Sequence, residues 1–182
     1  SRIRSASGAP LPGGLVRSPP WRAPHHSTTP VALLGGGSDA LRPGELSRAH
    51  GGVLFLDELG EFPPSVLDAL RQPLEDGVIH LSRARFSALL PARILLVAAM
   101  NPCPCGEAGR PGACRCTDAA LARYHRRLSG PLVDRFDLRV VVGRPTPEQL
   151  LGGAVGEPTA AVAARVRRVR ERAAGRGVRC NA

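Results

Sequence analysis

Residues 51–58 read Gly51-Gly52-Val53-Leu54-Phe55-Leu56-Asp57-Glu58, and they indicate the class of fold more strongly than any other part of the chain. Two glycines lead into four consecutive apolar residues, and these lead into two adjacent carboxylates. A continuous apolar run of this kind predicts a strand that is buried on both faces, as in a parallel sheet. Carboxylates at the C-terminal end of such a strand lie where open α/β sheets bind their ligands. The alternative is a buried strand that simply ends in two exposed acids.

The two carboxylates suit two different tasks at a nucleotide. Asp57 can hold a Mg²⁺ ion against a phosphate, through oxygen ligands and water. Glu58, which we expect to point to the other face of the strand, can orient a hydrolytic water. The pair is therefore typical of the Walker B element of an ATPase.

The composition is that of a globular protein rich in turns. The chain has 182 residues, of which 43% are hydrophobic but only 3% aromatic, with 21 glycines and 18 prolines. This length gives room for one domain of ordinary size, or for one domain and part of a second. No apolar run approaches the roughly 20 residues of a membrane helix, and no signal peptide is recognisable. These features predict a cytoplasmic protein without a membrane partner.

All 25 basic residues are arginine, and the formal net charge is +10. An ordinary P-loop needs a lysine to reach the phosphates, so the sequence contains no ordinary Walker A motif. We therefore expect a fragment that begins after the P-loop. The positive charge suits a polyanionic partner such as DNA. An arginine-only composition equally suits a genome rich in G and C.

Two further apolar runs predict two further strands and, with the helical segments between them, an α/β fold. The first run spans residues 94–100 and ends in Asn101, and the second spans residues 138–142. An asparagine at the end of a strand beside Walker B can hold the attacking water or sense the γ-phosphate.

Arg135 lies in a turn just before the last of these strands. From there it can reach the nucleotide of a neighbouring subunit as an arginine finger, which stabilises the charge that develops in the transition state. The alternative is a salt bridge within the chain, to Asp134 or Asp137.

The remaining segments carry weaker signals. Residues 1–30 have neither a helical nor a strand period and predict an extended loop. Residues 78–82 and 86–90 predict a β-hairpin around Arg83 and Arg85, which can contact a nucleic-acid backbone or simply be solvated. A turn and short helix are predicted at 42–50, followed by a helix that Pro63-Pro64 opens and Pro73 ends or kinks. Towards the C-terminus, the sequence predicts an arginine-rich helix at 121–128, a linker at 143–158, and an amphipathic helix at 159–175 with a basic face.

Metal-binding chemistry is present in two places. Four of the five cysteines form two Cys-x-Cys pairs with eight residues between them: Cys103, Cys105, Cys114 and Cys116. In a cytosolic protein such cysteines favour a structural Zn²⁺ site over a disulfide, and free thiols are the other alternative. Cys180 has no partner. The second place is His25-His26, adjacent histidines in a loop, which are more often surface contacts than metal ligands.

A series of motifs covers roughly residues 20–182. They are Arg22-Ala23-Pro24-His25-His26-Ser27, Leu34-Gly35-Gly36-Gly37, the run from Pro43 to Leu59, Pro73-Leu74-Glu75-Asp76-Gly77, Pro91-Ala92-Arg93, Val97-Ala98-Ala99-Met100-Asn101-Pro102, and the run from Leu128 to Leu138. Their text and order resemble the magnesium-chelatase-like AAA+ ATPases of bacteria, often called the YifB or ComM family.

This resemblance implies a partial AAA+ P-loop NTPase core, in which helices flank a parallel sheet and a β-hairpin precedes sensor 1. The core would span residues 1–145, with a Cys-rich loop at 102–117. Residues 146–182 would form a linker and the start of a helical lid.

The resemblance also assigns roles to residues. Asp57 and Glu58 would form Walker B and serve Mg²⁺ and ATP, Asn101 would be sensor 1, and Arg135 would be the arginine finger. In related hexamers the hairpin before sensor 1 faces the pore, which draws attention to Arg83 and Arg85.

For function, the resemblance implies a hexameric ATP-driven motor on branched or single-stranded DNA. The P-loop and a sensor-2 arginine lie outside this region in the family, so the fragment alone is expected to be inactive.

One alternative function is that of a chelatase subunit that drives metal insertion into a porphyrin; the Cys-rich loop and the helix at 121–128 favour DNA. Another is an enhancer-binding transcription activator, but residues 1–50 lack the Gly-Ala-Phe-Thr-Gly-Ala loop of that class. A third is a non-enzymatic, zinc-stabilised DNA-binding module.

Overall fold

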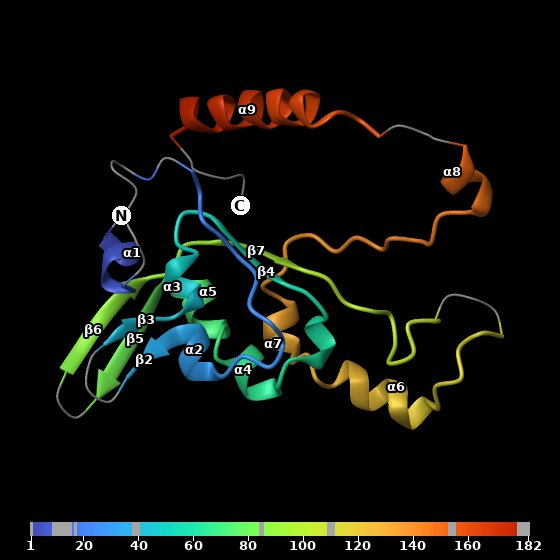
Figure 1. Cartoon of the computed structure of the whole chain (residues 1–182), viewed down its shortest axis with the longest axis horizontal. Helices are drawn as coiled ribbons and strands as arrows, with labels where there is room; N and C mark the ends of the chain where they lie inside the picture. Colours follow the sequence, from blue (N-terminus) through green and yellow to red (C-terminus); the bar gives the residue numbers. More distant parts are fainter. Residues whose placement is uncertain are drawn as a thin grey trace. The chain divides into compact units, whose positions relative to one another are not determined.

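The computed structural model describes residues 2–8, 16, 18–37, 41–83, 86–108, 112–152 and 156–177. The chain forms two compact units, Ser1–Leu138 and Arg139–Ala182 (Figure 1). The first unit is a mixed α/β structure that contains a small parallel sheet and two antiparallel strand pairs. The domain boundary predicted after residue 145 stays a prediction.

The parallel sheet of the first unit has three strands in the order β1-β4-β7. They are β1 (Trp21–Arg22), β4 (Val53–Leu56) and β7 (Leu95–Ala98), and both pairs of neighbours are parallel. Figure 1 shows β4 and β7 side by side. The structure thus confirms the strands predicted from the apolar runs after Gly52 and Arg93.

The two faces of this sheet are buried to different degrees. Leu54 and Leu56 are fully buried, whereas Phe55, which points to the other face, is only partly buried and stacks on Trp21. On β7, Leu95 remains 59% exposed. Burial on both faces was predicted, but within the described residues it holds for one face of the sheet only.

Four short helices pack against the buried face. They are α2 (Pro30–Leu34), α3 (Glu45–Arg48), α4 (Pro64–Asp68) and α5 (Arg71–Asp76), and with the strands they build a core around Leu33, Leu46, Leu54, Leu56, Phe62, Val66, Leu67 and Leu70. Pro64 occupies the first turn of α4, as predicted. In a continuous helix the Pro73 ring would collide with the carbonyl of Ala69, so the interruption falls between α4 and α5, one turn earlier than predicted.

Two antiparallel strand pairs complete the sheet structure. The predicted hairpin is present as β5 (Val78–Arg83) and β6 (Phe86–Pro91), with Val78 opposite Pro91 and Arg83 opposite Phe86. The other pair is β2 (Gly35–Gly36) with β3 (Arg42–Pro43). Arg85 lies outside the described residues, and only the backbone of Arg83 is described. Contact of these arginines with nucleic acid therefore stays a prediction.

The ends of the first unit differ from the prediction. Residues 1–30 do not form only an extended loop, because they contain helix α1 (Arg2–Ala6) and strand β1. A five-residue helix is too short to show an apolar stripe, so periodicity did not reveal it. The helix predicted at 121–128 is α6 (Asp118–His125), which begins earlier because Thr117 caps it by accepting a hydrogen bond from the amide of Ala120. The short helix α7 (Gly130–Val133) follows.

The predicted strand at 138–142 is wrong. Among the described residues no strand pairs with this segment. The side chains of Leu138, Val140, Val141 and Val142 are at least 80% exposed. An apolar run becomes a strand only where a neighbouring strand takes up its backbone hydrogen bonds.

The second unit contains two helices, α8 (Pro147–Leu151) and α9 (Thr159–Gly175). The first lies within the predicted linker and begins at a capping box between Thr146 and Gln149. The second is the predicted amphipathic helix; its role as part of a lid stays a prediction. Across the described residues, none of the helices combines the length and hydropathy that a membrane span requires.

Candidate active site and cysteine cluster

Asp57, Glu58 and Asn101 meet at one edge of the parallel sheet. The two carboxylates follow β4, and Asn101 lies shortly after β7, whose Ala98 is in register with Leu56. Two backbone hydrogen bonds of 2.9 Å fasten these strand ends together, from the amide of Ala99 to the carbonyl of Leu56 and from the amide of Leu59 to the carbonyl of Ala99. All three predicted side chains are exposed. This edge, the C-terminal edge of the sheet, therefore presents two carboxylates and an amide to solvent.

Glu58 has a left-handed backbone, with φ 51° and ψ 49°, and is the only non-glycine residue with positive φ among those described. The prediction that Glu58 would point to the opposite face of the strand is wrong, because β4 ends at Leu56 and Glu58 opens the 3-10 turn η1 (Leu59–Glu61). Its amide donates a 2.9 Å hydrogen bond to Oδ1 of Asp57. A left-handed conformation costs a residue with a side chain about 1–2 kcal/mol, so the surrounding contacts hold this turn in place.

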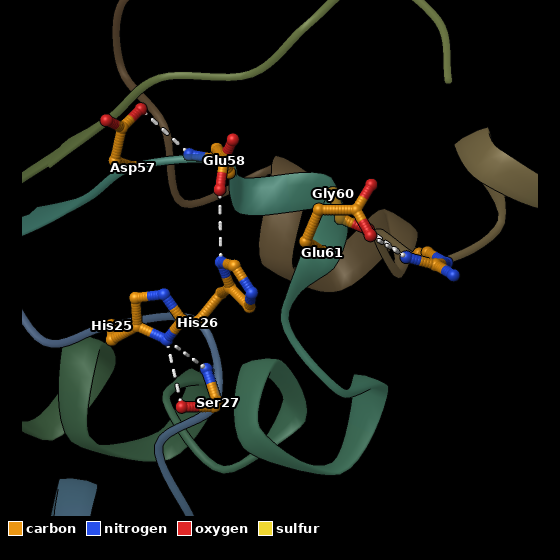
Figure 2. Close-up of polar contacts among 8 residues, drawn as sticks. His25, His26, Ser27, Asp57, Glu58, Gly60 and Glu61 are labelled. Atoms are coloured by element: carbon orange, nitrogen blue, oxygen red, sulfur yellow. Dashed lines mark hydrogen bonds and ion pairs between the residues drawn. The ribbon is translucent and has the colours of Figure 1, made fainter. Parts of the chain in front are cut away.

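The carboxylate of Glu58 faces His26 (Figure 2). Nδ1 of His26 lies 3.1 Å from Oε2 of Glu58, and the side chains are 32% and 54% exposed. His25 has a different partner: its Nδ1 lies 2.9 Å from Oγ of Ser27 and accepts a hydrogen bond from the Ser27 amide. From the sequence, these histidines were predicted only as metal ligands or surface contacts. Their position shortly after β1 places them near Glu58, but the pairing of β1 with β4 is visible only in the sheet.

Helix α6 braces both strand ends. The hydroxyl of Tyr124 donates a 3.2 Å hydrogen bond to the carbonyl of Asn101, and burial of its ring raises the pKa of this hydroxyl. Nη1 of Arg127, just after the helix, donates to the carbonyl of Gly60 and pairs with Glu61 at 3.0 Å. One helix thus supports the segment that carries Asn101 and the turn that follows Glu58.

Gly60→Ala is expected to disrupt the packing of Tyr124 on the turn after Glu58 and so to lower the stability of the domain. A Cβ atom at Gly60 would lie 2.6 Å from atoms of the Tyr124 ring, which is only 5% exposed and cannot move without losing its hydrogen bond to Asn101. Overpacking of this kind costs about 1–3 kcal/mol. For a domain of this size the midpoint of thermal unfolding should fall by about 2–4 °C for each kcal/mol.

The matched control for this substitution is Gly130→Ala, because a Cβ at Gly130 meets no atom within 4 Å. Its midpoint should stay within about 1–2 °C of the wild type. Equal midpoints for the two variants would contradict the tight packing of Tyr124 on Gly60.

Arg135, the predicted arginine finger, is engaged within its own chain. Its Nη2 lies 2.5 Å from Oε2 of Glu75, a residue of α5. The alternative weighed from the sequence was a salt bridge to Asp134 or Asp137; the ion pair is formed, but with a residue distant in sequence. The finger role stays a prediction.

The four cysteines of the Cys-x-Cys pairs form one cluster. Their Sγ atoms all lie within 4.8 Å of one another, and in the described part of the chain no other group of three or more potential ligands comes together in this way. The separations are 3.3 Å for Cys103–Cys105 and 3.8 Å for both Cys103–Cys114 and Cys105–Cys114. A disulfide needs about 2.05 Å, so these four thiols are not cross-linked.

The cluster has sulfur separations close to those of a tetrahedral metal site, and its thiols differ in pKa. With Zn–S bonds of about 2.3 Å, the sulfurs of a regular tetrahedron lie about 3.8 Å apart. The backbone N–H of Glu107, and then the side chains of Cys103 and Cys116, lower the pKa of Cys105 to about 6 by hydrogen bonding. At Cys116 a backbone hydrogen bond lowers the pKa, but hydrogen bonds with the other thiols and desolvation outweigh it and raise the pKa to about 12; the pKa of Cys114 is also raised. The amide of Ala108 points at Sγ of Cys103, at 3.2 Å. Because thiolates are the metal-binding form of cysteine, the donor set fits Zn²⁺.

The comparisons with known proteins agree on one family. Residues 1–150 match the family described as "Magnesium chelatase, subunit ChlI". An uncharacterized protein of Mycobacterium tuberculosis is 52% identical over 92% of this chain, and the uncharacterized protein YifB of Escherichia coli is 50% identical over 91%. The competence protein ComM of Haemophilus influenzae is 51% identical over 84%. The matches cover 34%, 33% and 30% of these relatives, so the chain spans about a third of their length.

Proposed function

Because the chain belongs to the magnesium chelatase ChlI family, we propose that it contributes the catalytic sheet edge of an AAA+ ATP hydrolase. The observation that carries this proposal is the meeting of Asp57, Glu58 and Asn101 at the C-terminal edge of two adjacent parallel strands. In open α/β sheets this edge is where ligands bind. The activity is proposed for the full-length protein, since the relatives are about three times as long as this chain.

Each of the three side chains has a task in this proposal. Glu58 accepts the proton of the attacking water, and Asn101 holds that water through its amide. Asp57 fits a Mg²⁺ ion that accompanies ATP, because it is an exposed carboxylate and carboxylate oxygens are preferred Mg²⁺ ligands. When bound, Mg²⁺ neutralises charge on the phosphate oxygens.

The proposal extends to Arg135 as an arginine finger between subunits of a homohexamer, with α9 as part of a lid. To reach a neighbouring nucleotide, the guanidinium would have to leave Glu75. The two side chains are 38% and 63% exposed. An exposed ion pair of this kind contributes about 0–1 kcal/mol to stability, so breaking the pair between Arg135 and Glu75 costs little free energy.

We propose branched or single-stranded DNA as the substrate of this motor in the cytoplasm. The net charge of +10 favours a polyanionic partner. The Haemophilus relative is named a competence protein, ComM. Arg123 in the last turn of α6 and Arg126 and Arg127 just after it, which follow the Cys-rich loop, also favour DNA over a chelatase that drives metal insertion.

The test is ATP hydrolysis by the full-length protein with Mg²⁺, with and without branched DNA. We expect turnover that DNA increases several-fold. Turnover indifferent to DNA would favour the chelatase-type alternative. If no turnover occurs, but DNA is bound without nucleotide in a strongly salt-dependent way, the enzyme is contradicted and a non-enzymatic DNA-binding module is favoured.

We also propose that the cysteine cluster holds a structural Zn²⁺. Support comes from the four Sγ atoms that lie within 4.8 Å of one another and from the 3.8 Å separations among them. Four thiolates form a closed tetrahedral site, which stabilises a fold and does no chemistry. The ion would join the two ends of the loop between β7 and α6.

A further inference from the structure

We infer that His26 is a positioning residue for Glu58, which it orients by donating a hydrogen bond from Nδ1 to Oε2. The inference rests on the proposed ATP hydrolysis and adds to it a side chain that touches neither water nor phosphate. Its basis is the 3.1 Å contact between the two side chains, drawn in Figure 2.

The hydrogen-bonding roles of the two adjacent histidines are opposite. An ionised carboxylate only accepts hydrogen bonds, so Nδ1 of His26 must carry a proton when it faces Glu58. Nδ1 of His25 instead accepts a hydrogen bond from the amide of Ser27, at 3.2 Å, so in a neutral His25 the proton is on Nε2. Of the two Nδ1 atoms, only that of His26 therefore acts as a donor, and its partner is Glu58.

His26 lies at this edge for the same reason as Glu58: each follows the C-terminal end of a strand of the parallel sheet. Strand β1 runs parallel to β4, with Arg22 in register with Leu54, so the segment that follows β1 leaves the sheet at the C-terminal edge. Two other rings lie near the ring of His26. Its centroid lies 4.0 Å from that of His25 and 6.4 Å from that of the buried Phe62, whose ring is roughly perpendicular. The segments after all three neighbouring strands thus contribute side chains to the edge: His26 after β1, Asp57 and Glu58 after β4, and Asn101 after β7.

Glu58 needs such a partner because its own position restrains it little. Its side chain is 54% exposed, and its backbone amide is taken up by Asp57 rather than by a sheet neighbour. A free glutamate samples many rotamers, and a misplacement of about 1 Å in a reacting group can cost roughly 100-fold in rate. The hydrogen bond from His26 engages Oε2 and leaves the second oxygen of the carboxylate for the attacking water.

The experiment compares His26→Ala, His26→Asn and Ser27→Ala in the full-length protein. We expect His26→Ala to lower kcat about 10–100-fold with KM for ATP unchanged, because orientation of the base matters only once the substrate is bound. His26→Asn should recover most of the loss, since its amide N–H can donate in place of Nδ1. Ser27→Ala is the matched control, because Ser27 is exposed and its hydroxyl contacts His25 rather than Glu58. It should keep kcat within about 2-fold of the wild type.

A second readout separates positioning from general damage. When Glu58 is already glutamine, His26→Ala should lower the residual kcat by less than 2-fold, because there is no longer a base to orient. The inference is overturned if His26→Ala keeps kcat within about 2-fold, as the control Ser27→Ala should, or if it raises KM without changing kcat. It is also overturned if asparagine restores nothing, or if the effect of His26→Ala persists in full beside Glu58→Gln. A wild-type protein that hydrolyses no ATP overturns the proposed function, and this inference with it.

Discussion

Replacement of Glu58 by glutamine is expected to lower kcat for ATP hydrolysis by the full-length protein about 10²–10⁴-fold, which is the usual contribution of a general base. The amide has the size of the carboxylate and can still accept a hydrogen bond from His26, which lies 3.1 Å away, so the turn should keep its geometry. An amide cannot take a proton from water at neutral pH. The affinity for ATP should therefore stay close to that of the wild type.

The measurement is steady-state hydrolysis together with nucleotide binding, and the matched control is Glu61→Gln. Glu61 lies on the same turn and is similarly exposed, but its carboxylate pairs with Arg127. We expect this control to lose less than about 5-fold in kcat. Full turnover in Glu58→Gln would place the proton acceptor on another residue, and a loss of ATP binding would show that the variant damages the edge itself.

Loss of zinc is expected to have the largest effect on stability. Cys103 is fully buried, and all four sulfurs lie within 4.8 Å. A serine in place of Cys103 removes one thiolate and leaves an open coordination site. Structural zinc contributes about 10–16 kcal/mol in small domains. Loss of even a third of this, about 4 kcal/mol, should lower the midpoint of thermal unfolding by about 10 °C.

This prediction is checked by metal analysis of protein purified under reducing conditions, followed by thermal unfolding with and without a chelator. We expect about one zinc per wild-type chain and none that survives dialysis in Cys103→Ser. The control is Cys180→Ser, since Cys180 belongs to neither Cys-x-Cys pair. A wild type that binds no zinc, even when zinc is supplied, would mean that the cysteines serve as free thiols.

What could be predicted from the sequence was local. The apolar runs before Asp57 and Asn101 are continuous and bounded by glycine or a polar residue, so they identify strands of a parallel sheet without further information. The hairpin of β5 and β6 was equally recognisable from its alternation and its polar tip. These signals were enough to bring Asp57, Glu58 and Asn101 to one edge.

The features that could not be predicted from the sequence depend on contacts between segments that are distant in the chain or on where a strand ends. The run at 138–142 has strand composition, but no described strand pairs with it, so composition alone was misleading. The left-handed backbone of Glu58 arises because β4 stops at Leu56, which a pattern of apolar residues does not reveal. The contact with His26 required the order β1-β4-β7, and no spacing in the sequence encodes that order.

The bracing of the edge by α6 has a consequence for how substitutions combine. Tyr124 holds the carbonyl of Asn101, its ring packs on Gly60, and Arg127 holds the carbonyl of Gly60. The two strand ends therefore share a single support, and energies of residues that share a support do not add. A substitution at Tyr124 and a substitution at Gly60 should therefore disrupt the same contacts. The double variant is expected to lose less stability than the sum of the losses in the two single variants. The edge behaves as one thermodynamic unit.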